Sequence, residues 1–270
     1  MLKFIVDSNL FLIYPAPIEK NQEVFVVKIL SIGNSFSQDS HKWLHKLAEK
    51  NNFDLHAVNL YIGGCSLEQH WNEYKNGSAD YDLEINGGSA IRKISLTEAL
   101  ETDTYDVITL QQASRHSGVP QSYYPYIVEL ADVVRRAQPQ AQLMFIKTWA
   151  YEIDSTHPGF DLYNKSQDEM YRRICDCSEL VAKLINARII PTGDVIQTLR
   201  REVPEFDYSN GGMSLCRDGF HLLMNYGRYA AAATMYRAVT GNKIKVTEFE
   251  NFDVDLMNKI VTVVEKVIEE

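Results

Sequence analysis

An apolar run that ends in a glycine constrains the fold of this chain more than any other stretch. Val24 to Ile32 is apolar at nearly every position and is followed by Gly33-Asn34-Ser35. A strand that is apolar on both faces needs helices on each side, as do the central strands of parallel sheets. Helical spacing follows from about Asp39 to Lys50, with Asp39 or Ser40 as the N-cap. The stretch therefore predicts one strand-to-helix unit of a layered α/β fold.

The order of strand then helix recurs along the chain. Further strands are expected at residues 53–60, 105–112, 142–148 and 188–191, and the helices near residues 67–74, 126–139, 166–186, 194–201, 226–240 and 253–268. Such alternation implies a three-layer α/β/α sandwich around a central, mostly parallel sheet of five strands.

The length and the absence of a Pro/Ser-rich linker indicate one domain. Of the 270 residues, 45% are hydrophobic, which suffices for one substantial core. We expect an N-terminal extension over residues 1–23 and a single domain over residues 24–270. Residues 66–100 exceed a simple crossover, and Asn86-Gly87 predicts a hairpin within them. This insertion is either a lid over a pocket or a surface addition.

Composition excludes several classes of function. The net charge of −9 and the lack of a Lys/Arg run argue against nucleic acid as a partner. Cys65, Cys175, Cys177 and Cys216 do not have the spacing of a disulfide framework or a zinc site. No glycine fingerprint for a nucleotide follows the first strand, so we expect neither a metal nor a cofactor.

The N-terminal segment contains short apolar runs that are interrupted by Asp7, Ser8 and Asn9. An export signal needs about 7–15 uninterrupted apolar residues, so we expect none that works here. No stretch is long enough to span a bilayer, and we expect no membrane partner. The location is left open between the cytoplasm, which this pattern favours, and the periplasm or exterior.

Ser35 suits two roles, a helix cap or a nucleophile, and the far end of the chain favours the second. A serine hydroxyl needs a base to take its proton, and the pKa of histidine suits neutral pH. Asp218 and His221 lie three residues apart at the end of a glycine-rich loop, residues 203–219. We expect His221 to be the base and Asp218 to orient its ring.

Glycine and amide residues at the ends of other strands suggest an oxyanion hole. Candidate donors are the backbone N–H groups of Ser35 and Gly64 and a side-chain amide of Gln111 or Gln112. Because side chains alternate along a strand, one glutamine is expected to face Ser35, and we prefer Gln112.

Aromatic residues and one further histidine are candidates for binding the substrate. Trp149 and Tyr151 follow the predicted strand 142–148, and His116 follows the strand 105–112. The remaining histidines are expected in surface or packing positions, namely His41, His45, His56, His70 and His157.

Four blocks of this sequence resemble those of the SGNH (GDSL-like) hydrolases. They are, in the order of that superfamily, Gly33-Asn34-Ser35, Gly63-Gly64, Gln111-Gln112 and Asp218-x-x-His221. More narrowly, the chain is similar to the bacterial DUF4886 family in the segments Ile32 to Ser37, Leu60 to Leu67, Leu110 to Gln112, Thr148 to Tyr151 and Arg217 to Leu222.

The resemblance implies a flavodoxin-like fold and ester hydrolysis through an acyl-enzyme. It assigns Ser35 as nucleophile, His221 as base and Asp218 as the residue that orients it. Most of the superfamily has Gly-x-Asn-Asp at the third block, whereas glutamine stands here, as in some carbohydrate acetylesterases. By that analogy the expected substrates are acyl esters, in the first place acetyl esters, of carbohydrates or small molecules.

Two other functions stay open. A lipase or thioesterase of the same fold would need an exposed apolar channel for the acyl chain. A carbohydrate-binding protein would keep the fold without turnover, and an intact Ser-His-Asp set argues against it.

Overall fold

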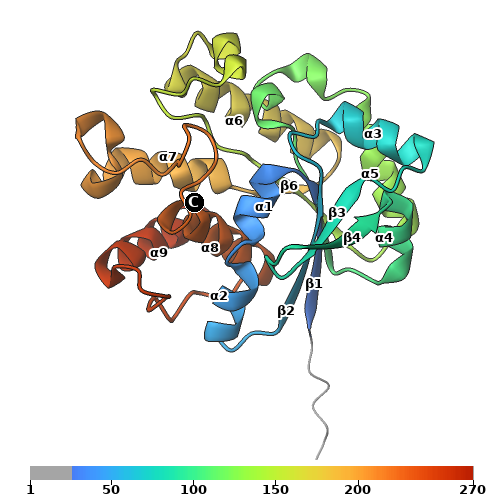
Figure 1. The fold of residues 1–270 in the computed structure, drawn as a ribbon, viewed down its shortest axis with the longest axis horizontal. Coiled ribbons are helices and arrows are strands. Elements are labelled where there is room, and N and C mark those ends of the chain that lie inside the picture. Colours follow the sequence, from blue (N-terminus) through green and yellow to red (C-terminus); the bar gives the residue numbers. More distant parts are fainter. Residues whose placement is uncertain (1–25, 270) are drawn as a thin grey trace, which may run out of the picture.

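The computed structural model describes residues 26–269, which form a sheet of seven strands between layers of helices (Figure 1). The strands are β1 (Val27–Gly33), β2 (Leu55–Tyr61), β3 (Tyr81–Ile85), β4 (Ala90–Ile94), β5 (Val107–Leu110), β6 (Gln142–Ile146) and β7 (Arg188–Ile190). Their order across the sheet is β4-β3-β2-β1-β5-β6-β7. The pairs β2-β1, β1-β5, β5-β6 and β6-β7 are parallel. Strand β3 is antiparallel to both of its neighbours, β2 and β4.

The predicted α/β class and mostly parallel sheet are confirmed, but the prediction of five strands is wrong. The two extra strands, β3 and β4, come from the hairpin in the 66–100 insertion, which pairs with the edge of β2. Asn86 and Gly87 both have positive φ at its turn, and Gly88 N–H donates to Ile85 O, as expected of an Asn-Gly hairpin. The turn lies beside Ala57, away from the carboxyl end of β2. A lid role for residues 66–100 stays a prediction.

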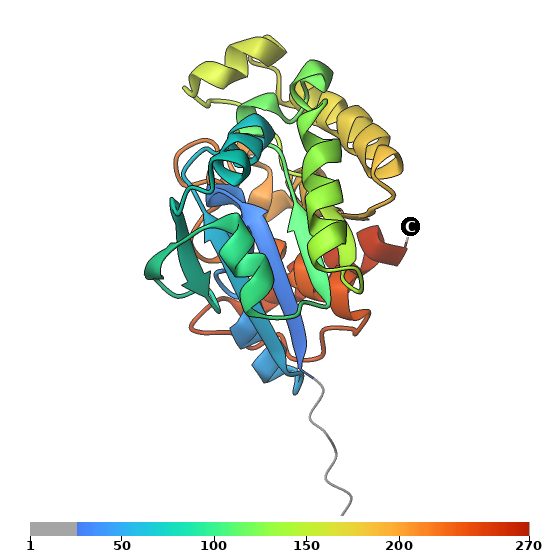
Figure 2. The ribbon, with the colours of Figure 1, turned by 90° about the vertical axis from the view of Figure 1, so that its right-hand side faces the viewer.

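Helices cover both faces of the sheet, as Figures 1 and 2 show. One face carries α1 (Ser35–His41), α2 (Leu44–Lys50), α7 (Thr192–Glu202), α8 (Tyr226–Thr240) and α9 (Val254–Glu269). The other carries α3 (Leu67–Asn76), α4 (Leu96–Thr102) and α5 (Tyr126–Ala137), which lie in front of the sheet in Figure 2. The long α6 (Gln167–Leu184) contributes side chains to both cores.

The central strand β1 explains why both layers are needed. Ile29 packs into the core under α8, whereas Leu30 and Ile32 pack into the core under α5. All three side chains are at most 1% exposed. Burying one such side chain stabilises the fold by about 1.5–3 kcal/mol, so an uncovered face would be costly.

The predicted helix 39–50 is wrong in its start and in its continuity. Two helices, α1 and α2, meet at Lys42 and Trp43, and α1 already begins at Ser35. Asn34 is the N-cap, because its side-chain oxygen accepts the Phe36 N–H at 3.0 Å. Asp39, which we expected as a cap, is buried inside α1 with other partners.

The extension over residues 1–23 and the first residues of the predicted strand 24–32 lie outside the described residues. Within residues 26–269, no helix combines the length and apolar character needed to cross a membrane.

The contact between α7 and the end of β6 generates a test of the packing. A Cβ on Gly193 would overlap the backbone carbonyl oxygen of Thr148, although alanine normally favours a helix over glycine. We expect Gly193→Ala to lower the free energy of unfolding by about 1–3 kcal/mol. Urea unfolding followed by circular dichroism measures it. A variant as stable as the parent would contradict this close approach.

Candidate active site

Three side chains predicted from distant parts of the sequence lie in one chain of hydrogen bonds. Ser35 Oγ is 2.9 Å from His221 Nε2, and His221 Nδ1 is 2.7 Å from Asp218 Oδ2. Ser35 follows β1 at the first position of α1, while Asp218 and His221 belong to the loop before α8. The structure therefore brings Ser35, His221 and Asp218 together in the expected order.

The partners of His221 define which ring nitrogen carries the proton. A carboxylate only accepts hydrogen bonds, so Nδ1 donates to Asp218 and the unprotonated Nε2 accepts from the Ser35 hydroxyl. Burial alone would raise the pKa of Asp218, but hydrogen bonds from the His221 ring and from two backbone N–H groups lower it overall. Asp218 is thus held as a carboxylate at neutral pH.

Ser35 is presented by a tight turn between β1 and α1. Asn34 caps the helix with its oxygen and donates from Nδ2 to Cys65 O at 2.9 Å, which ties this turn to the one after β2. Gly33 is needed because any Cβ there would overlap the buried Ser37 hydroxyl. The half-buried Ser35 hydroxyl consequently points to the carboxyl edge of the sheet.

A buried carboxylate holds the loop that carries Asp218 and His221. Asp39 on α1 is 0% exposed and accepts from Leu222 N–H at 2.8 Å. It also accepts from Arg217 Nη1 at 3.2 Å and from Arg228 Nε at 2.7 Å. Its three partners thus flank Asp218 and His221 in sequence, and they fix the loop to the helix that begins with Ser35.

Trp149 contacts both the start of α1 and the loop that carries His221. Its ring stacks on Phe36 with centroids 3.9 Å apart, and its Nε1 donates to Phe220 O at 2.7 Å. We expected Trp149 to bind the substrate, but its side chain is 0% exposed and does not line the pocket. It instead supports the residues next to Ser35 and next to His221.

A pocket of about 210 Å³ opens at Ser35. Its lining residues are Ser35, Tyr61, Gly63, Gly64, Ala113, Ser114, Arg115, His157, Phe220 and His221. The backbone N–H groups of Ser35 and Gly64 have no acceptor within residues 26–269. Gly64 adopts a φ of +63°, which favours glycine there. Two residues that line the pocket, Ser35 and Gly64, therefore have free N–H groups.

Neither glutamine lines this pocket, and both are buried with other partners. Gln111 Nε2 donates to Asn34 Oδ1 at 2.7 Å, beneath the cap of α1. Gln112, which we preferred, accepts from Leu67 N–H and Ala113 N–H and donates to Ser122. The two side chains have different partners, and the NH₂ group of each donates to the protein rather than into the pocket.

Comparison with known proteins identifies the family of this chain. A model of the domain of unknown function DUF4886 matches residues 28–264. A crystal structure of a DUF4886 family protein from Bacteroides uniformis is 32% identical, has a TM-score of 0.84, and is matched over 91% of this chain and 95% of that one. The chain belongs to the DUF4886 family.

More distant solved structures share the fold of this DUF4886 chain. A proposed SGNH hydrolase from Slackia heliotrinireducens is 20% identical with a TM-score of 0.54, over 79% of this chain and 99% of that one. A mutant of Axe2, an acetyl-xylooligosaccharide esterase from Geobacillus stearothermophilus, is 12% identical with a TM-score of 0.50, over 83% and 99%. No curated protein matches the chain. The fold is therefore that of the SGNH hydrolases.

The pocket of the DUF4886 chain also contains residues that the sequence did not single out. His157 and Arg115 line it, whereas His116, which we expected there, does not. Tyr151 is fully buried, and its hydroxyl lies 2.8 Å from Ser114 Oγ. Nothing in the sequence distinguishes His157 from the packing histidines, because it reaches the pocket only through the path of the loop after β6.

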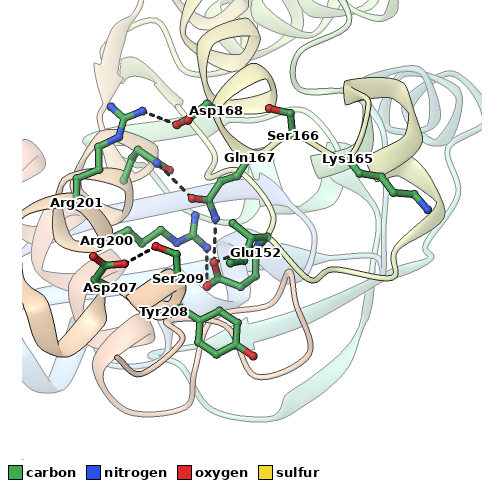
Figure 3. A pocket seen from close by; sticks show the side chains of 12 residues that line it. Glu152, Lys165, Ser166, Gln167, Asp168, Arg200, Arg201, Asp207, Tyr208 and Ser209 are labelled. Atoms are coloured by element: carbon green, nitrogen blue, oxygen red, sulfur yellow. Dashed lines mark hydrogen bonds and ion pairs between the residues drawn. The ribbon is translucent and has the colours of Figure 1, made fainter. Parts of the chain in front are cut away.

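A larger cavity of about 620 Å³ is lined by the loop after β6, the start of α6, the end of α7 and residues 207–209 (Figure 3). Four of its charged side chains form two ion pairs within the lining. Buried Glu152 lies 3.4 Å from Arg200 Nη2, and Arg201 is 2.7 Å from Asp168. Glu152 also donates its N–H to Gly219 O, so this pair supports the loop of the DUF4886 site.

Asp39 offers a quantitative test of how the loop is held. Asp39→Asn leaves Arg217 and Arg228 without their carboxylate, and breaking a buried pair costs about 3–5 kcal/mol of stability. Asp161→Asn is the matched control, because Asp161 is 70% exposed in its pair with Lys165 and should change stability by less than about 1 kcal/mol. Urea unfolding of both variants measures the difference. Equal, small effects would contradict the role of Asp39.

Proposed function

We propose that this chain is a serine ester hydrolase that acts through an acyl-enzyme. The observation that carries the proposal is the hydrogen-bonded order Ser35–His221–Asp218 at the carboxyl edge of the sheet. Each member has the partner that activation of a serine requires: a base on the hydroxyl and a carboxylate on the other ring nitrogen. The SGNH hydrolase fold is consistent with this chemistry.

The proposed reaction follows from these contacts. Ser35 Oγ attacks the ester carbonyl carbon while its proton passes to His221 Nε2. The tetrahedral intermediate collapses, the bond to the alcohol oxygen breaks, and the alcohol leaves with the proton from His221. Water then attacks the acyl-enzyme with His221 as base, and the carboxylic acid is released as Ser35 is restored.

The oxyanion hole in this proposal consists of backbone donors. The N–H groups of Ser35 and Gly64 are free of other acceptors and flank the pocket. Donors of this kind are fixed before reaction and stabilise charge only as it develops on the carbonyl oxygen. Gln111 then acts indirectly, because its amide holds Asn34, which ties both donor turns together.

Short acyl esters, acetyl esters foremost, are the proposed substrates, with a carbohydrate as the alcohol. The pocket of about 210 Å³ has a largely polar lining and suits a small acyl group. Axe2, of the same fold, is an acetyl-xylooligosaccharide esterase. A lipase or thioesterase would need a longer apolar channel, which the lining residues do not provide.

The first experiment tests the nucleophile. We expect Ser35→Ala to lower hydrolysis of 4-nitrophenyl acetate by about 10⁴-fold or more, because no other group in the site takes over the attack. Ser89→Ala, an exposed serine in the hairpin loop, is the control and should leave kcat unchanged. Circular dichroism confirms folding of both. Turnover by Ser35→Ala near that of the parent would show that the site is misplaced. A parent that turns over no ester would favour the carbohydrate-binding alternative.

The second experiment separates the two glutamines. We expect Gln111→Ala to lower kcat by about 10-fold at nearly constant KM, because Asn34 loses a hydrogen bond that positions it. Gln112→Ala should keep kcat within about 2-fold but lower stability by about 1–3 kcal/mol, since two buried N–H groups lose their acceptor. Steady-state kinetics and urea unfolding measure both. A fall in kcat of about 10²–10³ for either variant would identify a direct side-chain donor instead.

A further inference from the structure

The pocket at Ser35 has an uneven set of charges. Of the side chains that line it, Arg115 is a permanent cation and none is a carboxylate. The site does contain one carboxylate, Asp218, which does not line the pocket. Its oxygens already accept hydrogen bonds from the His221 ring and from two backbone N–H groups. The pocket therefore presents a positive group and no counter-charge of its own.

Arg115 is exposed and forms no ion pair with any carboxylate within residues 26–269. Its Nε donates only to the ring of His116 at 3.4 Å. A shortage of acids does not explain this, because the chain has 36 Asp and Glu against 27 Lys and Arg. In the larger cavity of Figure 3, by contrast, Arg200 and Arg201 are paired with Glu152 and Asp168.

The backbone of Arg115 is held firmly although its side chain has no carboxylate partner within residues 26–269. Its carbonyl oxygen accepts from the Tyr163 hydroxyl at 2.9 Å, and that hydroxyl accepts from Gly118 N–H at 2.9 Å. A Cβ on Gly159 would lie only 2.5 Å from Arg115 Cβ, so the two segments are in close contact. The guanidinium therefore extends from a backbone segment whose position at the pocket is fixed.

The charge of Arg115 acts on the histidines around it. Burial lowers the pKa of His157, and the nearby Arg115 cation lowers it further. The pKa of His116 is lowered in the same way. Both shifts favour the neutral form of the ring, whereas the Arg115 guanidinium keeps its charge.

We propose that the ester hydrolysed at Ser35 carries a carboxylate on its alcohol part, and that Arg115 binds this carboxylate. The substrate class is then the acyl esters of acidic sugars or similar hydroxy acids. The guanidinium is a planar fork that matches a carboxylate with two parallel hydrogen bonds. The small pocket takes the acyl group, and the alcohol part extends toward the exposed Arg115. This inference rests on the proposed ester hydrolysis and adds the charge of its substrate.

Two matched probes test the proposal, 3-(4-acetoxyphenyl)propanoate and its carboxamide. They release phenols of similar acidity and differ in the charge at the far end. We expect the parent to prefer the carboxylate by about 5-fold or more in kcat/KM, mainly through KM. Arg115→Gln should bring the ratio close to 1, and Arg115→Glu should invert it. Added salt should reduce the preference of the parent, because the contact is exposed.

Arg172→Gln is the matched control. It removes the same charge from an exposed position on α6, where Arg172 pairs with Asp176 outside the pocket, and it should keep the parent ratio. A parent ratio near 1, or a preference that survives Arg115→Gln, would overturn the inference while leaving ester hydrolysis intact.

Binding to the inactive protein makes the inference independent of turnover. In Ser35→Ala, calorimetric titration with the intact probes should give a Kd about 5-fold lower for the carboxylate than for the carboxamide, and a second substitution, Arg115→Gln, should remove the difference. Equal Kd values would overturn the inference. If neither probe is hydrolysed by the parent, the proposed function fails, and the titration still decides whether Arg115 binds a carboxylate.

Discussion

The buried carboxylate of Asp39 is the interaction on which the arrangement of the site depends most. An acid that is 0% exposed is costly to bury, and here it is matched by Arg217, Arg228 and the N–H of Leu222. These partners lie in α8 and in the loop before it, whereas Asp39 belongs to α1, the first helix after β1. One ion cluster therefore joins the helix that begins with Ser35 to the loop that carries Asp218 and His221.

Around this cluster, each turn at the carboxyl edge is tied to a neighbouring turn. Asn34 bonds the turn after β2 and receives a bond from Gln111 after β5, while Trp149 after β6 contacts residues on both sides of the Ser35–His221 pair. These hydrogen bonds hold the turns at the carboxyl edge in place, although the turns themselves are not part of a helix or strand. Rigid donors are what electrostatic stabilisation of a developing oxyanion requires.

The sequence predicted the layered fold and the meeting of Ser35 with His221, because both depend on periodicity and on motifs at strand ends. It did not predict that the hairpin would extend the sheet, since an exposed edge strand has no distinctive pattern. The contacts of Asp39 and of the two glutamines could also not be predicted from the sequence. Which way a polar side chain near a strand end points depends on acceptors from distant segments, and these exist only in the folded chain. His157 and Arg115 reach the pocket by loop paths for the same reason.

The separation along the chain between the two halves of the site has a consequence for synthesis. Ser35 and His221 are 186 residues apart, and Asp39 and Arg228 are 189 apart. A ribosome therefore produces Ser35 long before His221, and Arg228, which binds Asp39, comes later still. Until α8 has left the exit tunnel and packed beneath α1, the serine is an ordinary hydroxyl. In the proposed reaction, the reactivity of Ser35 therefore depends on folding of the chain through α8, and ester hydrolysis would report that step.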